Sequence, residues 1–450
     1  MLVPDDYADR RIAIIGCGYV GLTLCAVMAD VGFDVTGVEI RDDVLAGLRR
    51  GVPQFHEPGL EAMLGRLVAS GRLRFVKTVA EAGDARVHVV TVGTPLDAQG
   101  RARLDMVERV SRDVAARLRP GDLVVMRSTL KLGTTRNVAM PILNEAGVAY
   151  DIAFCPERTI EGIALPELRV LPQIVAGDTL AATVRASQLF QFLTPTTVRV
   201  SSIETAEMIK LVDNAQRDVH FAFANEIARM CDVSGIAAAE VIKAGKLGYP
   251  RTNLPMPGPV GGPCLSKDPY ILAESFENTG VTPEIVIAAR RINERQAVEA
   301  ARNMRAAADR LIGFPAKPSI AFLGLAFKGR PATDDLRGTP TRLIVDAVAE
   351  EFPGATLRGW DEIVPAREIE TFGLAPARAL ADAFAGAHLV VICNNHPAFE
   401  AMALETLSES MASPGFVYDF WNNFDPRRLS MPAKRAYVAL GGFGVAAGLA

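Results

Sequence analysis

A glycine-rich turn between a strand and a helix is the feature that most constrains the fold of this chain. The apolar run Arg11–Ile15 leads into Gly16-Cys17-Gly18-Tyr19-Val20-Gly21, a helical segment follows over residues 22–31, and residues 35–38 form a second strand. In such a unit the first glycine allows the tight turn, the second lets backbone amides approach a pyrophosphate, and the third lets the helix pack on the strand. The N-terminus of the helix adds partial positive charge. The sequence therefore predicts a Rossmann-type unit that binds a dinucleotide through Gly16, Gly18, Tyr19, Val20 and Gly21.

An acidic residue at the end of the second strand indicates which dinucleotide binds. Glu39 lies 18 residues after Gly21. A carboxylate there accepts hydrogen bonds from the ribose hydroxyls and repels a 2′-phosphate, so NAD is predicted as the cofactor rather than NADP. Arg41 lies close to this carboxylate in the sequence and weakens the preference.

Two further predicted strands end in turns that carry hydroxyl groups. Residues 87–92 run into Gly93-Thr94, and residues 123–126 run into Arg127-Ser128-Thr129. Ligands of a doubly wound sheet bind beyond the carboxyl ends of its strands, so Thr94 and Thr129 are predicted to face the cofactor. The alternative is that both are ordinary turn hydroxyls.

The middle of the chain contains one long predicted helix over residues 204–230, in which apolar residues recur at helical spacing. Lys210 and Asn214 are four residues apart and therefore share one face, where a lysine and an amide can hydrogen-bond an oxyanion. A solvated helix face is the alternative. At 1.5 Å per residue the helix would span roughly 40 Å, which suits a connector between domains or a subunit interface.

A second series of strands and helices follows. Strands are predicted over residues 318–324, 356–360, 389–393 and 416–419, with a helix over residues 341–351. No second Gly-x-Gly-x-x-Gly occurs, so a second dinucleotide is not expected, and Lys328 and Arg337 are candidate phosphate ligands. The predicted fold class is α/β, with two Rossmann-like doubly wound parallel-sheet domains joined by a long central helix. The expected domains are an NAD-binding domain over residues 1–200, a central helical dimerisation and cysteine-bearing region over 201–312, and a C-terminal Rossmann-like domain over 313–450.

A cysteine in a loop rich in glycine and proline is the main candidate for chemistry. The loop reads Pro259-Val260-Gly261-Gly262-Pro263-Cys264-Leu265-Ser266-Lys267-Asp268. Its glycines allow backbone to approach a ligand closely, a nearby cation favours the thiolate, and a carboxylate can move protons. Cys264 is thus predicted to form a covalent bond to a carbon centre. The alternative is a buried cysteine in a turn.

Composition excludes several functional classes. The 450 residues carry a net charge of −4, which leaves no basic excess for a nucleic-acid partner. No apolar run reaches membrane-spanning length, and the acidic N-terminus predicts no signal peptide. Residues 440–450 are expected to form a frayed or loosely packed end. Six scattered cysteines without a CxxC pair predict neither a zinc site nor a disulfide framework, and they fit the reducing cytoplasm.

Together these motifs resemble the UDP-glucose/GDP-mannose dehydrogenase family, the nucleotide-sugar 6-dehydrogenases, over residues 11–423. Besides the glycine-rich turn and the cysteine loop, the matching motifs are Glu57-Pro58-Gly59-Leu60, Pro156-Glu157-Arg158 with Glu161-Gly162, Ala206-Glu207, Lys210-Leu211, Asn214, Asn225-Glu226, Gly324-Leu325-Ala326-Phe327-Lys328, and Asp334-Asp335-Leu336-Arg337. The resemblance implies a homodimer or a larger homo-oligomer with the long helix at the interface.

The resemblance also implies a four-electron oxidation of a UDP-sugar at C6 to the uronate, with NAD as the acceptor of two successive hydrides. Cys264 would trap the aldehyde as a thiohemiacetal, and water would hydrolyse the thioester that follows. Lys210 and Asn214 would stabilise the C6 oxyanion. Asp268, Glu157 and Thr129 would position water and move protons. Glu161, Lys267 and Arg337 would lie near the cofactor. Substrate contacts would come from Glu157, Arg158, Glu161, Lys210, Asn214, Arg251, Asn253, Gly261 and Lys328, with Arg251 able to reach a neighbouring site.

Some positions depart from the family pattern. The lysine usual five residues after the ribose-binding acid is Val44 here, and Leu265-Ser266 replace an aromatic residue and a proline typical of UDP-glucose dehydrogenases. The approach over residues 250–259 looks like the UDP-N-acetylmannosamine branch, from which Pro263 and Lys267 differ. The predicted substrate is therefore UDP-N-acetylmannosamine or UDP-glucose. Two other functions stay open: a two-electron alcohol dehydrogenase with a structural Cys264, and a non-catalytic protein that binds NAD and a nucleotide sugar.

Overall fold

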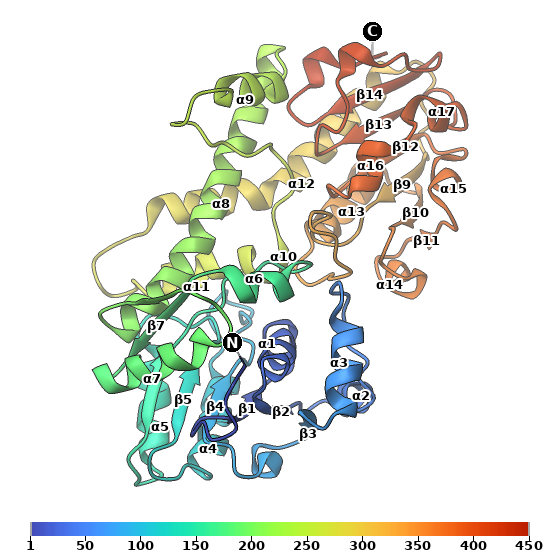
Figure 1. The fold of residues 1–450 in the computed structure, drawn as a ribbon. Coiled ribbons are helices and arrows are strands. Elements are labelled where there is room, and N and C mark those ends of the chain that lie inside the picture. The colour runs from blue at the N-terminus through green and yellow to red at the C-terminus, as the bar shows by residue number, and fades with distance from the viewer. Residues whose placement is uncertain (1, 449–450) are drawn as a thin grey trace. The chain divides into compact units, whose positions relative to one another are not determined.

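The computed structural model describes residues 2–448 and contains two compact α/β units (Figure 1). The first unit consists of Met1–Asn214 and Tyr270–Thr282, and the second of Ala215–Pro269 and Pro283–Ala450. The division falls inside the long helix α8 (Ile203–Ser234), so the first part of this helix belongs to one unit and the second part to the other. Each unit is built around one sheet.

The sheet of the first unit has eight strands in the order β3-β2-β1-β4-β5-β6-β7-β8. These strands are β1 (Arg11–Ile15), β2 (Asp34–Val38), β3 (Leu73–Val76), β4 (Val87–Val90), β5 (Leu123–Met126), β6 (Asp151–Phe154), β7 (Gln173–Gly177) and β8 (Thr197–Arg199). The strand order changes direction between β1 and β4, the point at which doubly wound sheets bind dinucleotides. The predicted Rossmann fold of this domain is confirmed.

One pair of strands departs from the predicted parallel sheet. β7 runs antiparallel to β6, with Ala153 opposite Gly177 and Phe154 opposite Ala176. The connection over residues 155–172, which includes helix α6 (Ala164–Val170), therefore leaves and re-enters the sheet at the same carboxyl edge instead of crossing back. As a result, the segment with the Pro-Glu-Arg motif stays at the edge where ligands bind.

Both faces of this sheet are buried, because successive residues of a strand point to opposite sides. On β1, Ile12 and Ile14 pack into one apolar cluster, and Ala13 and Ile15 pack into the other. The first cluster includes residues of α1 (Tyr19–Asp30) and α3 (Leu60–Ala69), and the second includes residues of α4 (Asp105–Ala115) and α5 (Met140–Asn144). Further helices of this unit are α2 (Asp42–Leu48) and α7 (Leu180–Gln191).

The sheet of the second unit has six parallel strands in the order β11-β10-β9-β12-β13-β14, which confirms the second Rossmann-like domain. These strands are β9 (Ser319–Leu323), β10 (Thr356–Trp360), β11 (Ala375–Pro376), β12 (Leu389–Ile392), β13 (Gly415–Asp419) and β14 (Arg435–Ala439). Ile320 and Phe322 of β9 pack with α12 (Glu284–Arg310) and α13 (Pro340–Glu351), whereas Ala321 and Leu323 join a cluster on the opposite face. Shorter helices of this unit are α9 (Ala238–Lys246), α10 (Gly262–Leu265), α14 (Ala366–Glu370), α15 (Leu380–Phe384), α16 (Pro397–Ala401) and α17 (Leu404–Glu409), whereas α11 (Asp268–Glu274) lies mostly in the first unit.

The turn after β9 is closed by a side chain of its own unit. Asp361, which follows β10, accepts hydrogen bonds from the backbone N–H groups of Leu325 at 2.6 Å and Ala326 at 3.3 Å. A Cβ at Gly324 would also overlap the side chain of Asn394. A carboxylate thus uses the backbone donors that a pyrophosphate would need, in agreement with the missing second glycine-rich motif.

The long helix α8 extends beyond its predicted end at Met230 and continues to Ser234. The other long helix of the chain is α12, which begins at Glu284 and ends at Arg310. Among the helices of residues 2–448, none is both long and apolar enough to cross a membrane.

The end of the chain is packed as far as residue 448, so the expectation of a loose end over residues 440–450 is wrong for this part. Ala447 exchanges backbone hydrogen bonds of 2.9 and 3.1 Å with Tyr437 of β14, and the N–H of Phe443 donates to Asp232 at 2.9 Å. Small residues permit this packing, since a Cβ at Gly441 would lie 2.6 Å from the Cβ of Ala238. The expectation also covered residues 449 and 450, which lie outside the described residues.

Candidate active site

The turn between β1 and α1 has the geometry that a dinucleotide pyrophosphate requires. Gly16 has a φ of +98°, a conformation that other residues rarely adopt. A Cβ at Gly21 would overlap the carbonyl oxygen of Gly16 and lie 2.6 Å from Thr91 Oγ1, so the third glycine is needed for packing. A Cβ at Gly18 would meet no atom within 4 Å. Gly18 therefore keeps space open at the N-terminus of α1, and the turn fits the NAD that the sequence predicts.

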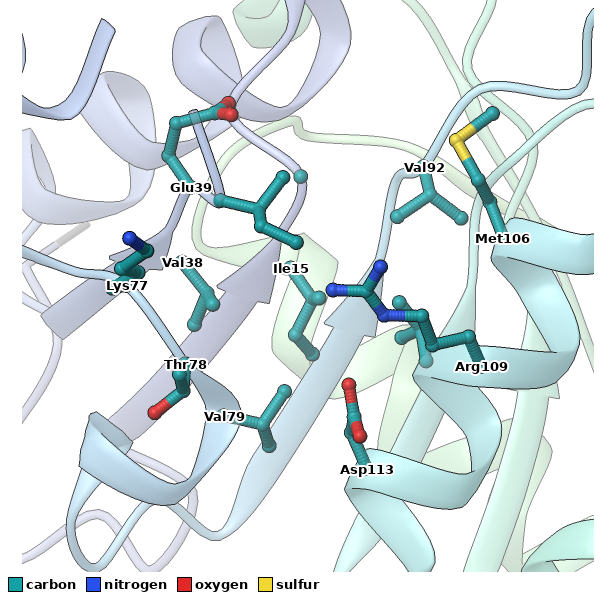
Figure 2. A pocket seen from close by; sticks show the side chains of 13 residues that line it. Ile15, Val38, Glu39, Lys77, Thr78, Val79, Val92, Met106, Arg109 and Asp113 are labelled. Atoms are coloured by element: carbon teal, nitrogen blue, oxygen red, sulfur yellow. The ribbon is translucent and has the colours of Figure 1, made fainter. Parts of the chain in front are cut away.

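A cavity of about 350 Å³ lies beside this turn (Figure 2). Its apolar lining consists of Ile15, Val38, Ile40, Val79, Val92, Met106 and Val110. Glu39 lines the same cavity, is 7% exposed, and accepts the backbone N–H of Arg41 at 2.9 Å. An apolar slot that includes a carboxylate suits an adenine ring and its ribose hydroxyls, which is the role predicted for Glu39.

Sequence reasoning missed two polar residues of α4 that line this cavity, Arg109 and Asp113. Figure 2 shows the guanidinium of Arg109 extending from α4 over the apolar lining toward Ile15. The sequence around α4 does not separate Arg109 from the neighbouring surface arginine Arg112, which pairs with Glu108 at 3.1 Å. The sequence offered one signal for Arg109: α4 follows β4, and the carboxyl end of β4 was already predicted to lie at the ligand site.

Val44 stands where the family usually has a lysine, and a different cation lies near the cavity. Val44 is buried in the core of the first unit. A different cation, Lys77, lines the cavity from the segment after β3 and pairs with Asp42 at 2.7 Å. Lys77 was not identified from the sequence because it lies 33 residues beyond Val44.

Three motifs that are far apart in the sequence meet at one buried carboxylate, that of Glu57. The hydroxyl of Tyr19 donates to Glu57, and the N–H groups of Gly162 and Ala164 donate to the same carboxylate, each at 2.7 Å. Burial and the neighbouring Glu57 raise the pKa of Tyr19, so its phenol stays protonated. The Tyr19 side chain thus ties the glycine-rich turn to the segment that carries Glu161, which leaves any cofactor contact of Tyr19 to its backbone.

Glu157, which was predicted to move protons, is held in a buried ion pair with Arg127. Its carboxylate accepts hydrogen bonds from Arg127 Nε at 3.1 Å and from the N–H groups of Arg158 and Thr159 at 2.7 and 2.8 Å. Burial alone would raise the pKa of Glu157, but Arg127 and the Thr159 amide outweigh burial, Lys210 adds to their effect, and the pKa lies below its usual range. Glu157 is therefore a fixed, ionised carboxylate near neutral pH, better suited to orient a cation than to carry a proton.

The turns after β4 and β5 are tied together. Thr94 Oγ1 donates to the carbonyl oxygen of Thr129 at 2.6 Å, so these two predicted residues do meet. Glu207 of α8 is fully buried and accepts the N–H groups of Gly133 and Thr135 at 2.6 and 2.9 Å, which anchors the segment after Thr129. The Thr94 hydroxyl thus has a structural partner, whereas the Thr129 side chain stays half-buried.

Lys210 and Asn214 lie one turn apart on α8, both within the first unit. Asn214 is 6% exposed and Lys210 is half-buried, so the alternative of a solvated helix face is wrong. Arg158 donates to the carbonyl oxygen of Pro172 at 2.6 Å and lies 3.7 Å from Asp213. These contacts orient the Arg158 guanidinium at the carboxyl edge of the sheet.

Cys264 belongs to the second unit and lies in α10. It is the exposed member of the six cysteines, all of which lie in the described part of the chain, so the alternative of a buried turn cysteine is wrong. Lys267 Nζ donates to Asp268 at 2.5 Å, and Asp268 is fully buried. The cation and the carboxylate predicted beside the thiol thus form a pair with each other.

The glycines of the cysteine loop permit close packing within the protein, where sequence reasoning expected close approach to a ligand. The N–H of Gly262 donates to the carbonyl oxygen of Gly338 at 2.7 Å, and a Cβ at Gly262 would lie 2.7 Å from a ring carbon of Phe327. A Cβ at Gly261 would lie 2.8 Å from Pro340. The loop therefore packs on two other motifs of the second unit, which the sequence presented as separate features.

The charged residues of these motifs have partners in the same unit. Lys328 Nζ lies 5.4 Å from the centre of the Phe327 ring. Arg337 makes a two-pronged contact with Asp335, with Nη2 at 2.6 Å and Nε at 2.9 Å. This contact fixes the direction of the Arg337 guanidinium, which stays largely exposed. The cofactor contact predicted for Arg337 stays a prediction.

The loop before the cysteine loop is exposed. Arg251 lies over the ring of Tyr249 at 4.6 Å and donates to its hydroxyl at 3.0 Å, and Asn253 is exposed two residues later. Both residues were predicted to contact the substrate. A solvent-facing arginine in such a loop is available to a ligand or to another subunit.

Comparison with known proteins gives one consistent family. Residues 10–194 match the NAD binding domain of the UDP-glucose/GDP-mannose dehydrogenase family, residues 204–295 match its central domain, and residues 321–426 match its UDP binding domain. The chain is 32% identical to the UDP-N-acetyl-D-mannosamine dehydrogenase of Pyrococcus horikoshii, over 89% of this chain and 93% of that protein. It is 33% identical to the UDP-N-acetyl-D-mannosamine dehydrogenase of Escherichia coli strain K12, over 87% and 94%.

Solved structures give the same result. The structure of the Pyrococcus horikoshii enzyme superposes with a TM-score of 0.86 at 30% identity and covers 96% of this chain and all of that one. A UDP-glucose dehydrogenase from Pyrobaculum islandicum shares the fold, with a TM-score of 0.84 at 24% identity over 98% of this chain and all of that one.

Proposed function

The chain belongs to the UDP-glucose/GDP-mannose dehydrogenase family and is an NAD-dependent UDP-sugar dehydrogenase, and we propose that it oxidises UDP-N-acetylmannosamine at C6 to the uronate through covalent catalysis by Cys264. The observation that carries the covalent step is that Cys264 is exposed while the other five cysteines are buried. The choice of sugar rests on the relatives that are at least 32% identical over most of their length.

Bound NAD supplies the acceptor for one hydride in each of the two oxidations. In the proposed route the Cys264 sulfur adds to the carbon of the C6 aldehyde, and the new thiohemiacetal oxygen takes up the proton that the thiol loses. Loss of a hydride from the same carbon to NAD, and of the hydroxyl proton to a base, leaves a thioester. Water then adds to that carbon, the C–S bond breaks, and the thiol re-forms as the carboxylate leaves. One alcohol and one water thus give one carboxylate with the removal of four electrons.

The supporting residues are assigned by their chemistry. Lys210 and Asn214 would stabilise negative charge on the C6 oxygen, one as a cation and the other as an amide donor. Thr129 and Asp268 would position water and move protons. Glu157 is ionised and paired with Arg127, so its proposed role is to orient Lys210.

The binding residues follow the same proposal. NAD would be held by Gly16, Gly18, Tyr19, Val20, Gly21, Glu39, Thr94, Thr129, Glu161, Lys267 and Arg337. The UDP-sugar would be held by Glu157, Arg158, Glu161, Lys210, Asn214, Arg251, Asn253, Gly261 and Lys328. Glu39 carries the preference for NAD, because it lines the cavity beside the glycine turn and would repel a 2′-phosphate.

UDP-glucose is the second candidate substrate. Lys267, which the UDP-N-acetylmannosamine branch often lacks, is present here and pairs with the buried Asp268. Leu265 and Ser266 stand where UDP-glucose dehydrogenases usually carry an aromatic residue and a proline, which favours the first candidate.

The exposed face of α8 supports a homodimer. Val212, Phe223, Met230 and Val233 lie on one side of this helix at helical spacing, and each is at least 40% exposed. An apolar stripe of this kind is usually covered by another surface, and a second copy of the same helix offers the matching stripe. We place the enzyme in the cytoplasm, because its proposed chemistry needs the Cys264 sulfur in the reduced state.

The test is the ratio of NADH formed to sugar consumed on a panel of UDP-N-acetylmannosamine, UDP-glucose, UDP-N-acetylglucosamine and GDP-mannose. We expect two NADH per UDP-N-acetylmannosamine and the highest kcat/KM for that sugar. A higher kcat/KM for UDP-glucose would select the second candidate. One NADH per sugar would indicate a two-electron dehydrogenase, and no NADH with any sugar would indicate a binding protein.

The covalent step is tested by Cys264→Ser. This variant should bind NAD as the wild type does and lose the overall oxidation. A matched control, Cys231→Ser, removes a buried thiol outside the loop and should keep turnover. Full turnover by Cys264→Ser would remove the covalent mechanism while leaving the dehydrogenase assignment in place.

A further inference from the structure

Four buried polar side chains hold both ends of the loop that carries Cys264. They are Asp218 and Asn225 on α8 and Arg290 and Asn293 on α12, and they are between 0% and 4% exposed. We refer to these four residues as the clasp. All four, and the loop over residues 258–265, belong to the second unit.

The helix geometry places the clasp residues together. Asp218 and Asn225 are seven residues apart, which is close to two turns, so they point to the same side of α8. Arg290 and Asn293 are three residues apart and share one face of α12. Asn293 Nδ2 joins the two helices, since it donates to Asp218 Oδ1 at 2.9 Å and to the Asp218 carbonyl oxygen at 3.0 Å.

The first end of the loop is held at Gly258 by the amide group of Asn225. The N–H of Gly258 donates to Asn225 Oδ1 at 2.9 Å, and Asn225 Nδ2 donates to the carbonyl oxygen of Gly258 at 3.1 Å. One side chain thus satisfies both backbone groups of one residue, as a neighbouring strand would. Asn225 Nδ2 also donates to Asn293 Oδ1 at 3.0 Å, which links this end to the rest of the clasp.

The second end is held at Leu265, the residue directly after Cys264. Arg290 Nη1 donates to the carbonyl oxygen of Leu265 at 2.6 Å and to Asp218 Oδ1 at 2.7 Å. Both are hydrogen bonds from a charged donor in a buried environment, the stronger kind of hydrogen bond in proteins. The backbone carbonyl next to the nucleophile is therefore tied to an ion pair that is itself fixed by Asn293.

A small cavity borders both the loop and the clasp. This cavity has a volume of about 90 Å³ and is lined in part by Gly261, Ser266, Arg290, Asn293 and Gln296. Cys264 does not line this cavity, and it is exposed. The middle of the loop packs on Gly338 and Phe327, and the hydrogen bonds of the clasp add restraint at its two ends.

We propose that Arg290 and Asn225 are positioning residues for the nucleophile: they fix the two ends of the loop and thereby the direction in which the Cys264 sulfur points. This inference rests on the proposed covalent role of Cys264. A nucleophile must be held within a fraction of an ångström of its attack position, and a misplacement of about 1 Å can lower the rate on the order of 100-fold. Neither positioning residue needs to touch the substrate.

The experiment compares Arg290→Lys with Arg295→Lys, the same substitution five residues later on α12. Arg295 is exposed and pairs with Glu299 at 3.3 Å, so its variant is the control. A lysine at position 290 keeps the charge beside Asp218, but its side chain is one bond shorter, so its nitrogen does not reach the Nη1 position from which Arg290 donates to both Asp218 and Leu265. Asn225→Ala is the second variant, and it leaves the Arg290–Asp218 pair intact.

Three quantities are measured on each folded protein: kcat, the KM for NAD, and the rate at which iodoacetamide alkylates Cys264 as a function of pH. We expect Arg290→Lys and Asn225→Ala to lower kcat by roughly 10-fold or more, to leave the KM for NAD within a factor of about two, and to change the alkylation profile. Arg295→Lys should change none of the three.

The outcomes separate the two proposals. Unchanged kcat and unchanged alkylation in both folded clasp variants would overturn the positioning role, and so would loss of the folded state in both, because the clasp would then be a stability element. The alkylation profile reports the loop even if Cys264 is not the catalytic nucleophile. If Cys264→Ser kept full turnover while the clasp variants changed the alkylation profile, the covalent mechanism would fail but the positional effect on the loop would stand.

Discussion

Arg127 and Glu157 form a buried ion pair at the carboxyl edge of the first sheet, and the pair connects the strand β5 to the Pro-Glu-Arg segment. Arg127 also donates to the carbonyl oxygen of Cys155 at 2.9 Å and to Gln173 at 2.8 Å. The Pro-Glu-Arg segment is therefore held in place by a buried ion pair and by hydrogen bonds from Arg127. A functional carboxylate predicted from the sequence thus also has a structural partner 30 residues away.

Glu157→Gln should lower the free energy of unfolding by about 3 kcal/mol at pH 7, because it leaves Arg127 buried without its counter-charge. The effect should depend on pH. The pKa of Glu157 is lowered in the folded protein, so the carboxylate stabilises the fold above its unfolded pKa of about 4.3, and this contribution is lost as the pH falls through the lowered folded pKa. Urea unfolding should show the gap between wild type and variant narrowing below about pH 4.

The control for this prediction is Glu108→Gln, which removes an exposed partner of Arg112. It should change the free energy of unfolding by less than about 0.5 kcal/mol at any pH. An equal effect of the two substitutions, or a Glu157→Gln effect that does not vary with pH, would contradict the prediction.

Replacing two glycines of the nucleotide turn by alanine should affect different properties: NAD affinity at Gly18 and thermal stability at Gly21. Gly18→Ala has free space around its Cβ in the protein, so this variant should keep its thermal midpoint while its Kd for NAD rises about 10-fold or more, because the methyl group enters the space left for the pyrophosphate. Gly21→Ala should unfold at lower temperature, because its Cβ would overlap the Gly16 carbonyl. Calorimetry of unfolding and of NAD binding measures both, and wild-type NAD affinity of Gly18→Ala would contradict the prediction.

Arg109→Ala should raise the KM for NAD with little change in kcat. The Arg109 guanidinium lies over the apolar slot, where it can stack on the adenine ring, and a cation–π contact of about 0.5–2 kcal/mol corresponds to a factor of roughly 2 to 30. Arg112→Ala, three residues later on α4, removes a surface arginine that does not line the slot, and it should leave the KM unchanged. Steady-state kinetics with NAD varied at saturating sugar provides the measurement, and equal KM values for the two variants would refute the assignment.

Phe223→Glu should convert the proposed dimer to a monomer, because it places a charge in the middle of the exposed apolar stripe of α8. Val298→Glu, which alters an exposed apolar residue on α12, is the matched control. Sedimentation velocity over a range of protein concentrations gives the oligomeric state. A Phe223→Glu protein that keeps the wild-type sedimentation coefficient would show that this face is not the interface.

The elements that were predicted well are those whose determinants are local. β1, the turn from Gly16 to Gly21 and the acid Glu39 lie within 29 residues, and the spacing of glycines and apolar residues specifies their geometry without reference to the rest of the chain. The long helix and the strands of the second unit were found for the same reason. Their ends shifted by up to four residues, as at Ser234, because helix ends depend on what they pack against.

What the sequence determined by itself is the set of chemical groups: a nucleotide turn, an acid for the ribose, a lysine and an asparagine on one helix face, and one cysteine in a loop of small residues. Only the tertiary structure decided which of these groups are exposed and which have partners. The antiparallel pairing of β6 with β7, the hydrogen bond of Tyr19 to Glu57, and that of Arg290 to Leu265 each join residues between 22 and 38 positions apart. The hydrogen bond of Gly162 to Glu57 joins residues more than 100 apart. Such contacts follow from strand order and helix packing. A buried charge or hydrogen-bond donor pairs with a partner that this packing brings near, because an unpaired buried polar group costs more free energy than local conformational preferences supply.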